Sequence, residues 1–309
     1  MLVVDANPAR KRRVVRVLSV LPCDVAERSF FSDFEDGAYD AVVVGWDDLG
    51  EGERDAMLRH AKNARRTSYV ALASTPDRST LDGLMRSSAI AHFIARPGEV
   101  DAVSLLTALQ KLFRGDVFGI EKYFEWCAEP KALRVRESSE RADVVRSAEL
   151  FLGTLGAPSR VVEGFAVAVD ELVTNALYHA PAAPPSSTRR THVSRASPVT
   201  LEPDEEIVVM LVSDGRRAGV SVSDPFGCLT QARALEHLAK YARREGQQVD
   251  EKPGGAGLGI CYVFDAMSEL VINIAPRKRT EIIGVVELDD TFRRTMERGK
   301  ALHVFVEPS

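Results

Sequence analysis

Two polar residues stand four positions apart in a segment that otherwise has the apolar pattern of a buried helix. They are Glu171 and Asn175, within the stretch Ala168–His179. Residues i and i+4 lie on the same face of a helix, so the carboxylate and the amide would project side by side. Oxygen ligands of this kind suit a magnesium-bound nucleotide. Taken alone, such a pair is more often two solvated polar groups on a capped surface helix.

Two later segments weigh against that alternative. Val222–Gly227 reads VSDPFG and contains Asp224, and Pro253–Gly259 reads PGGAGLG. In this order and at this spacing, the three segments resemble the N, G1 and G2 boxes of the GHKL ATPase superfamily, and within it the anti-sigma-factor serine kinases. The resemblance covers about Lys131 to Asp289, and the three boxes together are far more specific than any one of them.

The resemblance implies a role for each candidate residue. Glu171 would be the general base that accepts a proton from, or orients, an attacking hydroxyl. Asn175, whose neutral carbonyl oxygen fits one direct ligand position, would bind Mg²⁺. Asp224 would accept a hydrogen bond from the exocyclic amine of adenine, and Thr280 would help to hold the base. ATP and Mg²⁺ are therefore the expected cofactors.

The glycine-rich segment provides a backbone that can approach phosphates closely. The other expected nucleotide-binding residues are Gly227, Gly254, Gly255, Gly257, Leu258 and Gly259. The helix predicted from Leu258 would direct free N–H groups and a favourable dipole toward the phosphates, and Leu229–Lys252 would form a lid. The G1 box departs from the usual D-x-G-x-G, because a proline and a phenylalanine follow Asp224. The proline stiffens the turn, and two consequences are open: the phenylalanine packs on the base, or the loss of backbone freedom weakens nucleotide binding.

The first 115 residues alternate short apolar runs with amphipathic helical patterns such as Pro8–Leu21 and Glu53–Ala64. Strands are predicted at Leu2–Val4, Ala41–Val44, Tyr69–Leu72 and His92–Ile94. This alternation is typical of a doubly wound parallel sheet. The half resembles a response-regulator receiver domain, and an unrelated flavodoxin-like α/β domain is the alternative.

Four coupled positions lack the chemistry of a working receiver. Ala6 follows Asp5 where a second acid is usual, and Gly45 stands at the expected phosphoacceptor. Ala73 stands in place of the switch hydroxyl. Arg96 stands where a receiver has a lysine, and its guanidinium is not equivalent to the compact ammonium that pairs with an acyl phosphate. We therefore interpret this half as a pseudo-receiver that serves protein contacts and does not accept a phosphoryl group.

The predicted organisation is two α/β domains joined by a linker. The segments are a pseudo-receiver at 1–115, an aromatic-rich linker at 116–130 that packs between the domains, an α/β sandwich of GHKL type at 131–289, and a C-terminal extension at 290–309. Residues 181–205 are rich in Pro, Ser, Thr and Arg, and we expect a flexible insertion there. Asp214-Gly215 predicts a hairpin, and His303–Val306 an added edge strand.

Composition narrows the partners and the compartment. A net charge of −5 over 309 residues does not indicate nucleic-acid binding. Four cysteines without C-x-x-C spacing argue against a zinc site or a disulfide framework. No apolar stretch approaches the ~20 residues that span a bilayer, and the N-terminus lacks the pattern of a signal peptide. A cytoplasmic protein without a membrane partner is expected.

The sequence thus predicts an ATP-dependent serine/threonine protein kinase of the anti-sigma-factor type, controlled by the pseudo-receiver. The partner implied is an anti-anti-sigma-like antagonist or a sigma-like regulator. A homodimer is a further possibility, although no interface can be recognised in the sequence. The alternative is a catalytically inactive signalling adaptor that acts through protein contacts, with or without ATP. A DNA-binding response regulator is disfavoured, since no helix-turn-helix or basic output domain is recognisable.

Overall fold

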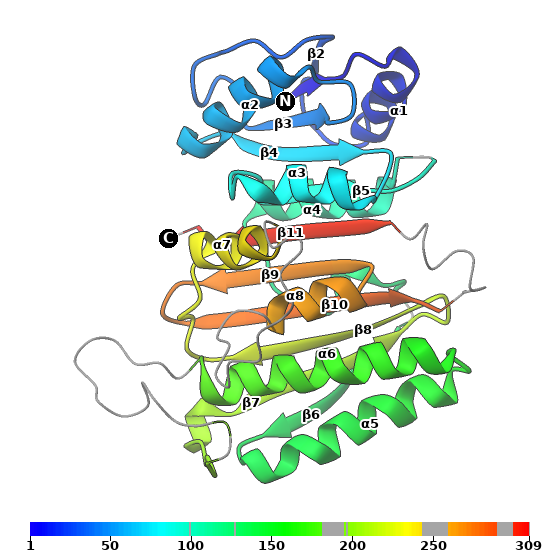
Figure 1. The fold of residues 1–309 in the computed structure, drawn as a ribbon, viewed down its shortest axis with the longest axis vertical. Coiled ribbons are helices and arrows are strands. Elements are labelled where there is room, and N and C mark those ends of the chain that lie inside the picture. The colour runs from blue at the N-terminus through cyan, green and yellow to red at the C-terminus, as the bar shows by residue number, and fades with distance from the viewer. Residues whose placement is uncertain are drawn as a thin grey trace. The chain divides into compact units, whose positions relative to one another are not determined.

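The computed structural model describes residues 1–98, 100–126, 128–180, 195, 197–242, 259–288 and 299–308. Within these ranges the chain is a mixed α/β protein with eight α-helices and eleven strands (Figure 1). It divides into two compact units. Unit 1 comprises Met1–Asp116, Leu238–Gln247 and Met296–His303, and unit 2 comprises Val117–His237, Gln248–Thr295 and Val304–Ser309. None of the helices in the described ranges is long and apolar enough to cross a membrane.

Unit 1 contains a parallel sheet with the strand order β2-β1-β3-β4-β5. Its strands are β1 (Leu2–Val4), β2 (Ala26–Arg28), β3 (Ala41–Gly45), β4 (Ser68–Ala73) and β5 (His92–Ala95). Its helices are α1 (Pro8–Leu18), α2 (Glu51–Asn63), α3 (Arg78–Arg86) and α4 (Ala102–Arg114). The four strands predicted for this half are confirmed, and every residue of β1 and β3 is buried. The order changes direction between β1 and β3, where the carboxyl ends of parallel strands leave a crevice.

The C-terminal strand begins earlier than predicted. β11 spans Lys300–Val306, and its residues Lys300–His303 pair antiparallel with β5 of unit 1. A strand therefore exists at the expected His303–Val306, but it starts three residues sooner, and the prediction of an edge strand is wrong because β11 has a neighbouring strand on each side. Its buried side chains, such as Leu302 and Val304, provide the apolar contacts that the short sequence pattern did not reveal.

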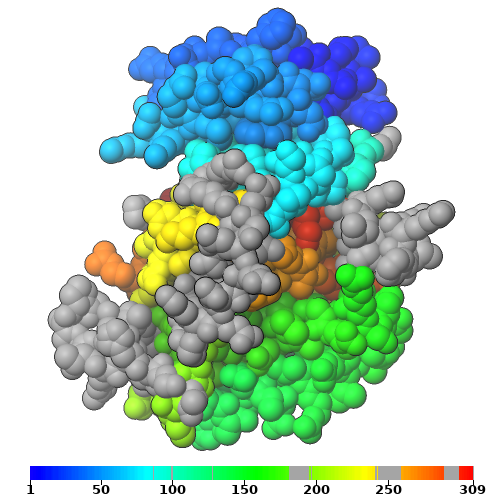
Figure 2. Space-filling view, viewed as in Figure 1, coloured from blue at the N-terminus to red at the C-terminus, as the bar shows by residue number. Residues whose placement is uncertain are grey.

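Unit 2 contains an antiparallel sheet in the order β9-β10-β8-β7-β6. Its strands are β6 (Lys131–Val135), β7 (Ile207–Ser213), β8 (Arg217–Asp224), β9 (Glu269–Ala275) and β10 (Arg279–Glu287). Its helices are α5 (Arg141–Thr154), α6 (Ser159–Tyr178) and α8 (Gly259–Ala266), while α7 (Gln231–Ala242) begins in unit 2 and its residues from Leu238 belong to unit 1. The predicted Asp214-Gly215 hairpin is confirmed, with Gly215 at φ +83. α5 and α6 pack side by side, and both are seen on the surface in Figure 2.

The two faces of this sheet carry different partners. Side chains alternate along a strand, so Thr280 and Gly284 share one face of β10 while Glu281 lies on the other. Met267, just after α8, packs on Gly284. The first face is therefore the one covered by helices, and it is also the face of Thr280.

The opposite face is covered by the segment that follows α4. This segment includes a 3₁₀ helix, η1 (Ile120–Tyr123). The Gly119 N–H donates to the buried carboxylate of Glu281 (2.9 Å), and the Arg279 guanidinium stacks over the Phe118 ring (4.6 Å to the centroid). Phe124 fills the space that Gly219 leaves by lacking a side chain. Phe118 and Phe124 of the predicted linker therefore pack on the sheet of unit 2.

The glycine groove generates a stability prediction. A Cβ on Gly219 would lie 2.6 Å from the Phe124 ring, so Gly219→Ala should lower the free energy of unfolding by about 1–3 kcal/mol. Gly153→Ala is the matched control, because nothing lies within 4 Å of a Cβ there, and it should stabilise by about 0.5–1 kcal/mol. Urea unfolding measures both. The double variant Gly219→Ala/Phe124→Leu should lose less than the sum of its parts, and strict additivity would contradict the contact.

Candidate functional site

The structure brings the first and third candidate motifs together. Glu171 lies within α6, and Gly259 is the first residue of α8. A Cβ built on Gly259 would fall 1.7 Å from Oε1 of Glu171, so the carboxylate occupies the space beside this glycine and no other residue fits. Helix N-termini present unpaired N–H groups and a positive dipole end, which stabilise negative charge. The predicted base and the start of the predicted phosphate-binding helix are thus direct neighbours.

Arg195 forms an ion pair with Glu171. Its Nη2 lies 3.2 Å from Oε1 and its Nη1 lies 3.4 Å from Oε2 of the carboxylate. The same Nη2 lies 3.2 Å from Nε2 of His179, the residue that follows α6. Burial lowers the pKa of His179, and the Arg195 charge lowers it further, against the opposite pull of Glu171. A neutral imidazole can accept a hydrogen bond from the guanidinium.

Asn175 lies one turn after Glu171 on the same helix and is half-buried. Within the described part of the chain no hydrogen bond reaches its side-chain amide, which leaves the carbonyl oxygen open to a ligand. Asp170, the other carboxylate of this stretch, instead pairs with Arg141 of α5 at 2.8 Å. The helix therefore separates a structural aspartate from the Glu171–Asn175 face.

Asp224 and Thr280 form the other end of the candidate site. They are register partners on β8 and β10, and their exposed fractions are 7% and 3%. Asp224 Oδ1 accepts hydrogen bonds from the N–H groups of Phe226 (3.0 Å) and Gly227 (3.3 Å). Burial nevertheless raises its pKa to about 6, and these bonds, the Thr280 hydroxyl and the Arg279 charge offset burial only in part.

The Thr280 hydroxyl is a buried polar group without a partner. It lies close enough to favour the ionised Asp224, yet no atom of the described residues meets it in hydrogen-bonding geometry. An unsatisfied buried hydroxyl costs about 1–3 kcal/mol in mutational measurements. A ligand that presents an acceptor to Thr280 and a donor to Asp224 would satisfy both.

Gly227 has a packing role in the turn after β8. Its φ of +59° lies in the left-handed region, and a Cβ there would fall 2.3 Å from the carbonyl oxygen of Ala275. Its own carbonyl accepts a hydrogen bond from the Arg277 N–H (3.0 Å). The segment Asp224–Gly227 is therefore held against the β9–β10 turn at Gly227, where a glycine is required.

Several predicted residues fall outside the description. Gly254, Gly255, Gly257 and Leu258 lie beyond the described residues, as does the predicted lid from residue 243 to Lys252. The same holds for residues 181–194 and 196 of the expected insertion. At its C-terminal end, Ser138 and Val199 exchange hydrogen bonds, and Leu201 donates to Arg136. That end is tied to β6 and the segment after it.

An arginine that the sequence reading missed fills the crevice of unit 1. The Arg10 guanidinium bonds to Asp5 (2.6 Å), Asp47 (2.8 Å), Asp48 (2.5 Å) and the Ser74 hydroxyl (2.9 Å). Burial alone would lower the pKa of Arg10, but the hydrogen bond and charge of Asp5 and the charges of the other carboxylates raise it overall. The described residues contain no group of three or more His, Cys, Asp or Glu arranged to hold a metal ion.

Gly45 makes room for this guanidinium. A Cβ at Gly45 would fall 2.5 Å from Nη2 of Arg10 and 2.7 Å from the carboxylate of Asp5. The residue at the expected phosphoacceptor position is thus small because an arginine passes over it. A basic residue in the first turn after β1, together with a glycine ending β3, was the available signal in the sequence.

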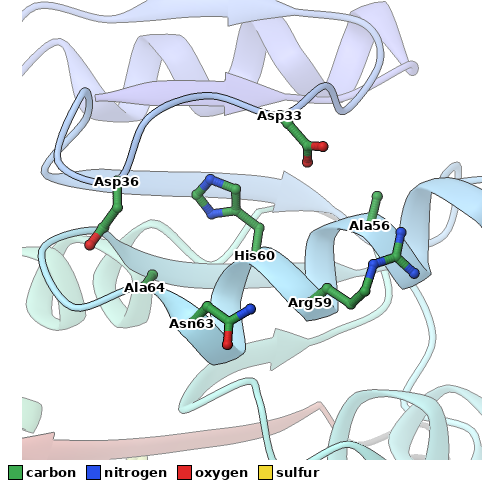
Figure 3. A pocket seen from close by; sticks show the side chains of 7 residues that line it. All are labelled: Asp33, Asp36, Ala56, Arg59, His60, Asn63 and Ala64. Atoms are coloured by element: carbon green, nitrogen blue, oxygen red, sulfur yellow. The ribbon is translucent and has the colours of Figure 1, made fainter.

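A pocket of about 330 Å³ elsewhere in unit 1 has a structural explanation (Figure 3). Its lining residues are Asp33, Asp36, Ala56, Arg59, His60, Asn63 and Ala64. Both ring nitrogens of His60 are engaged, Nε2 with the Phe34 carbonyl (2.7 Å) and Nδ1 with the Tyr69 hydroxyl (2.5 Å). Asp36 accepts the N–H groups of Arg65, Arg66 and Thr67. These polar groups hold a loop on α2.

Comparison with known proteins adds no family assignment. Neither a scan against protein-family models nor a search of curated proteins found a match. The candidate site therefore rests on the geometry of Glu171, Gly259, Asp224 and Thr280 and on the motif resemblance.

Loss of Arg10 should destabilise unit 1. Arg10 and Asp5 have side-chain exposures of 13% and 1%, so Arg10→Met would leave a buried carboxylate without its partner and cost about 2–4 kcal/mol. Arg12→Met on the exposed side of α1 is the control and should stay within about 0.5 kcal/mol of wild type. Chemical denaturation compares the two. Equal midpoints for both variants would refute the role of Arg10.

The raised pKa of Asp224 makes a pH prediction. Because its folded pKa of about 6 exceeds the unfolded value of 3.8, the folded state holds the proton more tightly and wild-type stability falls as pH rises through this window. Asp224→Asn removes the effect. The variant should gain about 2–3 kcal/mol relative to wild type between pH 4 and pH 7. Parallel stability profiles over this range would rule out the raised pKa.

Proposed function

We propose that this protein binds ATP with Mg²⁺ in unit 2 and transfers the terminal phosphoryl group to a serine or threonine of a partner protein, as the anti-sigma-factor kinases do. One observation carries the proposal. Glu171 lies against Gly259 at the start of α8, while Asp224 and Thr280 face each other on the helix-covered side of the same unit's sheet. These are the positions that the three motifs assign to base, phosphate and adenine.

The nucleobase end is supported by the buried Asp224 carboxylate and by the unsatisfied Thr280 hydroxyl. Adenine offers an amine donor, which an ionised Asp224 would accept, and a ring nitrogen acceptor, which would satisfy the buried Thr280 hydroxyl. Guanine carries a carbonyl oxygen where adenine has its amine. An acceptor at Asp224 therefore favours ATP over GTP.

The reaction end is supported by Glu171 and Asn175 on one face of α6. The hydroxyl oxygen of the partner forms a bond to the γ-phosphorus, the bond from that phosphorus to the bridging oxygen breaks, and ADP leaves. Glu171 accepts the hydroxyl proton in this step. Asn175 would hold Mg²⁺, which neutralises phosphate charge.

Unit 1 would act as a pseudo-receiver in this account. The crevice at the ends of β1 and β3 already contains a cation, the Arg10 guanidinium, and Gly45 offers no carboxylate. Its contribution would be a surface for a regulatory partner.

The same observations favour a second candidate, a signalling adaptor without phosphotransfer. Arg195 covers the carboxylate that should accept the proton, and in unit 1 a glycine, Gly45, stands at the expected phosphoacceptor position. Such an adaptor would act through protein contacts, with or without ATP bound.

Nucleotide binding separates the candidates first. Asp224→Ala should weaken the affinity for a fluorescent ATP analogue by at least about tenfold, because the adenine amine loses its acceptor. Asp204→Ala, at an exposed position of a 3₁₀ turn, should bind like wild type. If wild type fails to bind the analogue at all, the kinase proposal is wrong.

Phosphotransfer is the second measurement that distinguishes the kinase from the adaptor. Wild type, incubated with Mg²⁺, labelled ATP and candidate antagonist proteins, should label one of them, and Glu171→Gln should abolish labelling although it still binds ATP. Binding of ATP without transfer to any candidate would favour the adaptor.

A further inference from the structure

Arg195 has no role in the reaction described above, yet it forms an ion pair with the carboxylate that the reaction needs. The chain beyond it is anchored, because the Tyr178 hydroxyl donates to the Ser197 carbonyl (3.0 Å) and Ser138 bonds Val199 in both directions. The guanidinium is therefore presented to the site from a fixed point two residues away. Its side chain is 41% exposed and that of Glu171 is 18% exposed.

A purely structural role explains this pair poorly. Ion pairs with this degree of exposure contribute about 0–1 kcal/mol of stability. The distances of 3.2 and 3.4 Å are also long for an arginine–carboxylate pair, for which about 2.7–2.9 Å is usual. Breaking this ion pair consequently costs little free energy, and a phosphate at the same place would compete with Glu171 for the guanidinium.

Resting on the proposed function, we propose that Arg195 recognises the terminal phosphate of ATP, and that Glu171 and His179 hold its guanidinium when no triphosphate is bound. Arginine donors match phosphate oxygens in a bidentate arrangement. Glu171 lies against Gly259, where the helix start also favours anions, so a phosphate bound there would lie within reach of the same guanidinium.

The transfer of Arg195 would couple substrate binding to catalysis. When the terminal phosphate takes the guanidinium, the Glu171 carboxylate loses its partner and can accept a hydroxyl proton. ADP lacks that phosphate and would leave the pair closed. His179 is suited to the resting state because its neutral ring accepts from Arg195 without adding charge.

Affinity for triphosphate and diphosphate nucleotides tests this role without any turnover. Isothermal titration with the Mg²⁺ complexes of a non-hydrolysable ATP analogue and of ADP should show that Arg195→Ala weakens the triphosphate about tenfold or more. ADP affinity should change by less than about twofold, which also shows that the variant is folded. Arg195→Lys should recover part of the loss. Arg216→Ala, an exposed arginine in the β7–β8 turn, should match wild type.

Glu171, which competes with the phosphate for Arg195, provides a second test of this role. Glu171→Gln should tighten triphosphate binding severalfold, because the resting ion pair is gone, and this gain should vanish in the Arg195→Ala background. Equal losses for ADP and triphosphate, or no loss for either, would overturn the role of Arg195 and leave ATP binding intact. Wild type that binds neither nucleotide would overturn both this role and the proposed function.

Discussion

The close approach of α6 to α8 is the constraint on which the candidate site depends. Because the Glu171 carboxylate occupies the space beside Gly259, the proposed base and the start of the proposed phosphate-binding helix cannot be separated without unpacking the two helices. The buried face of α6, which includes Phe165, Val169 and Leu172, holds this geometry through apolar packing. A carboxylate beside a helix N-terminus is electrostatically favourable, so packing and charge act in the same direction.

The β-sheet of unit 2 positions the other end of the site by register. Pairing of β8 with β10 sets Asp224 opposite Thr280, and alternation puts their side chains on the helix-covered face. The neighbouring residues Arg279 and Glu281 point to the other face, where the Phe118–Phe124 segment covers them. A change in that segment would therefore alter the packing of the strands that carry Asp224 and Thr280.

The sequence predicted the elements better than the contacts. Periodicity located β1, β3, β4 and β5, and the Asp-Gly turn located the hairpin of unit 2, because these signals are local. Arg10 and Arg195 were missed because most of their partners are distant in sequence: Asp47 and Asp48 for Arg10, and Glu171 for Arg195. The contact of Phe124 with the sheet of unit 2 was not predicted for the same reason: the space that receives its ring exists only after Gly219 and Glu281 lie on one sheet face. The helix N-terminus at Gly259 was anticipated within one residue.

Base discrimination tests the central claim, an adenine-specific nucleotide site in unit 2, most directly. Calorimetric titration of the wild-type protein with Mg²⁺·ATP and Mg²⁺·GTP compares two ligands with identical phosphates, so a difference in affinity reports contacts with the base, where Asp224 and Thr280 are proposed to act. The account predicts that ATP binds at least about tenfold more tightly than GTP, because Asp224 accepts from the adenine amine and meets a carbonyl oxygen in guanine. Equal affinities, or no binding of either nucleotide, would contradict it.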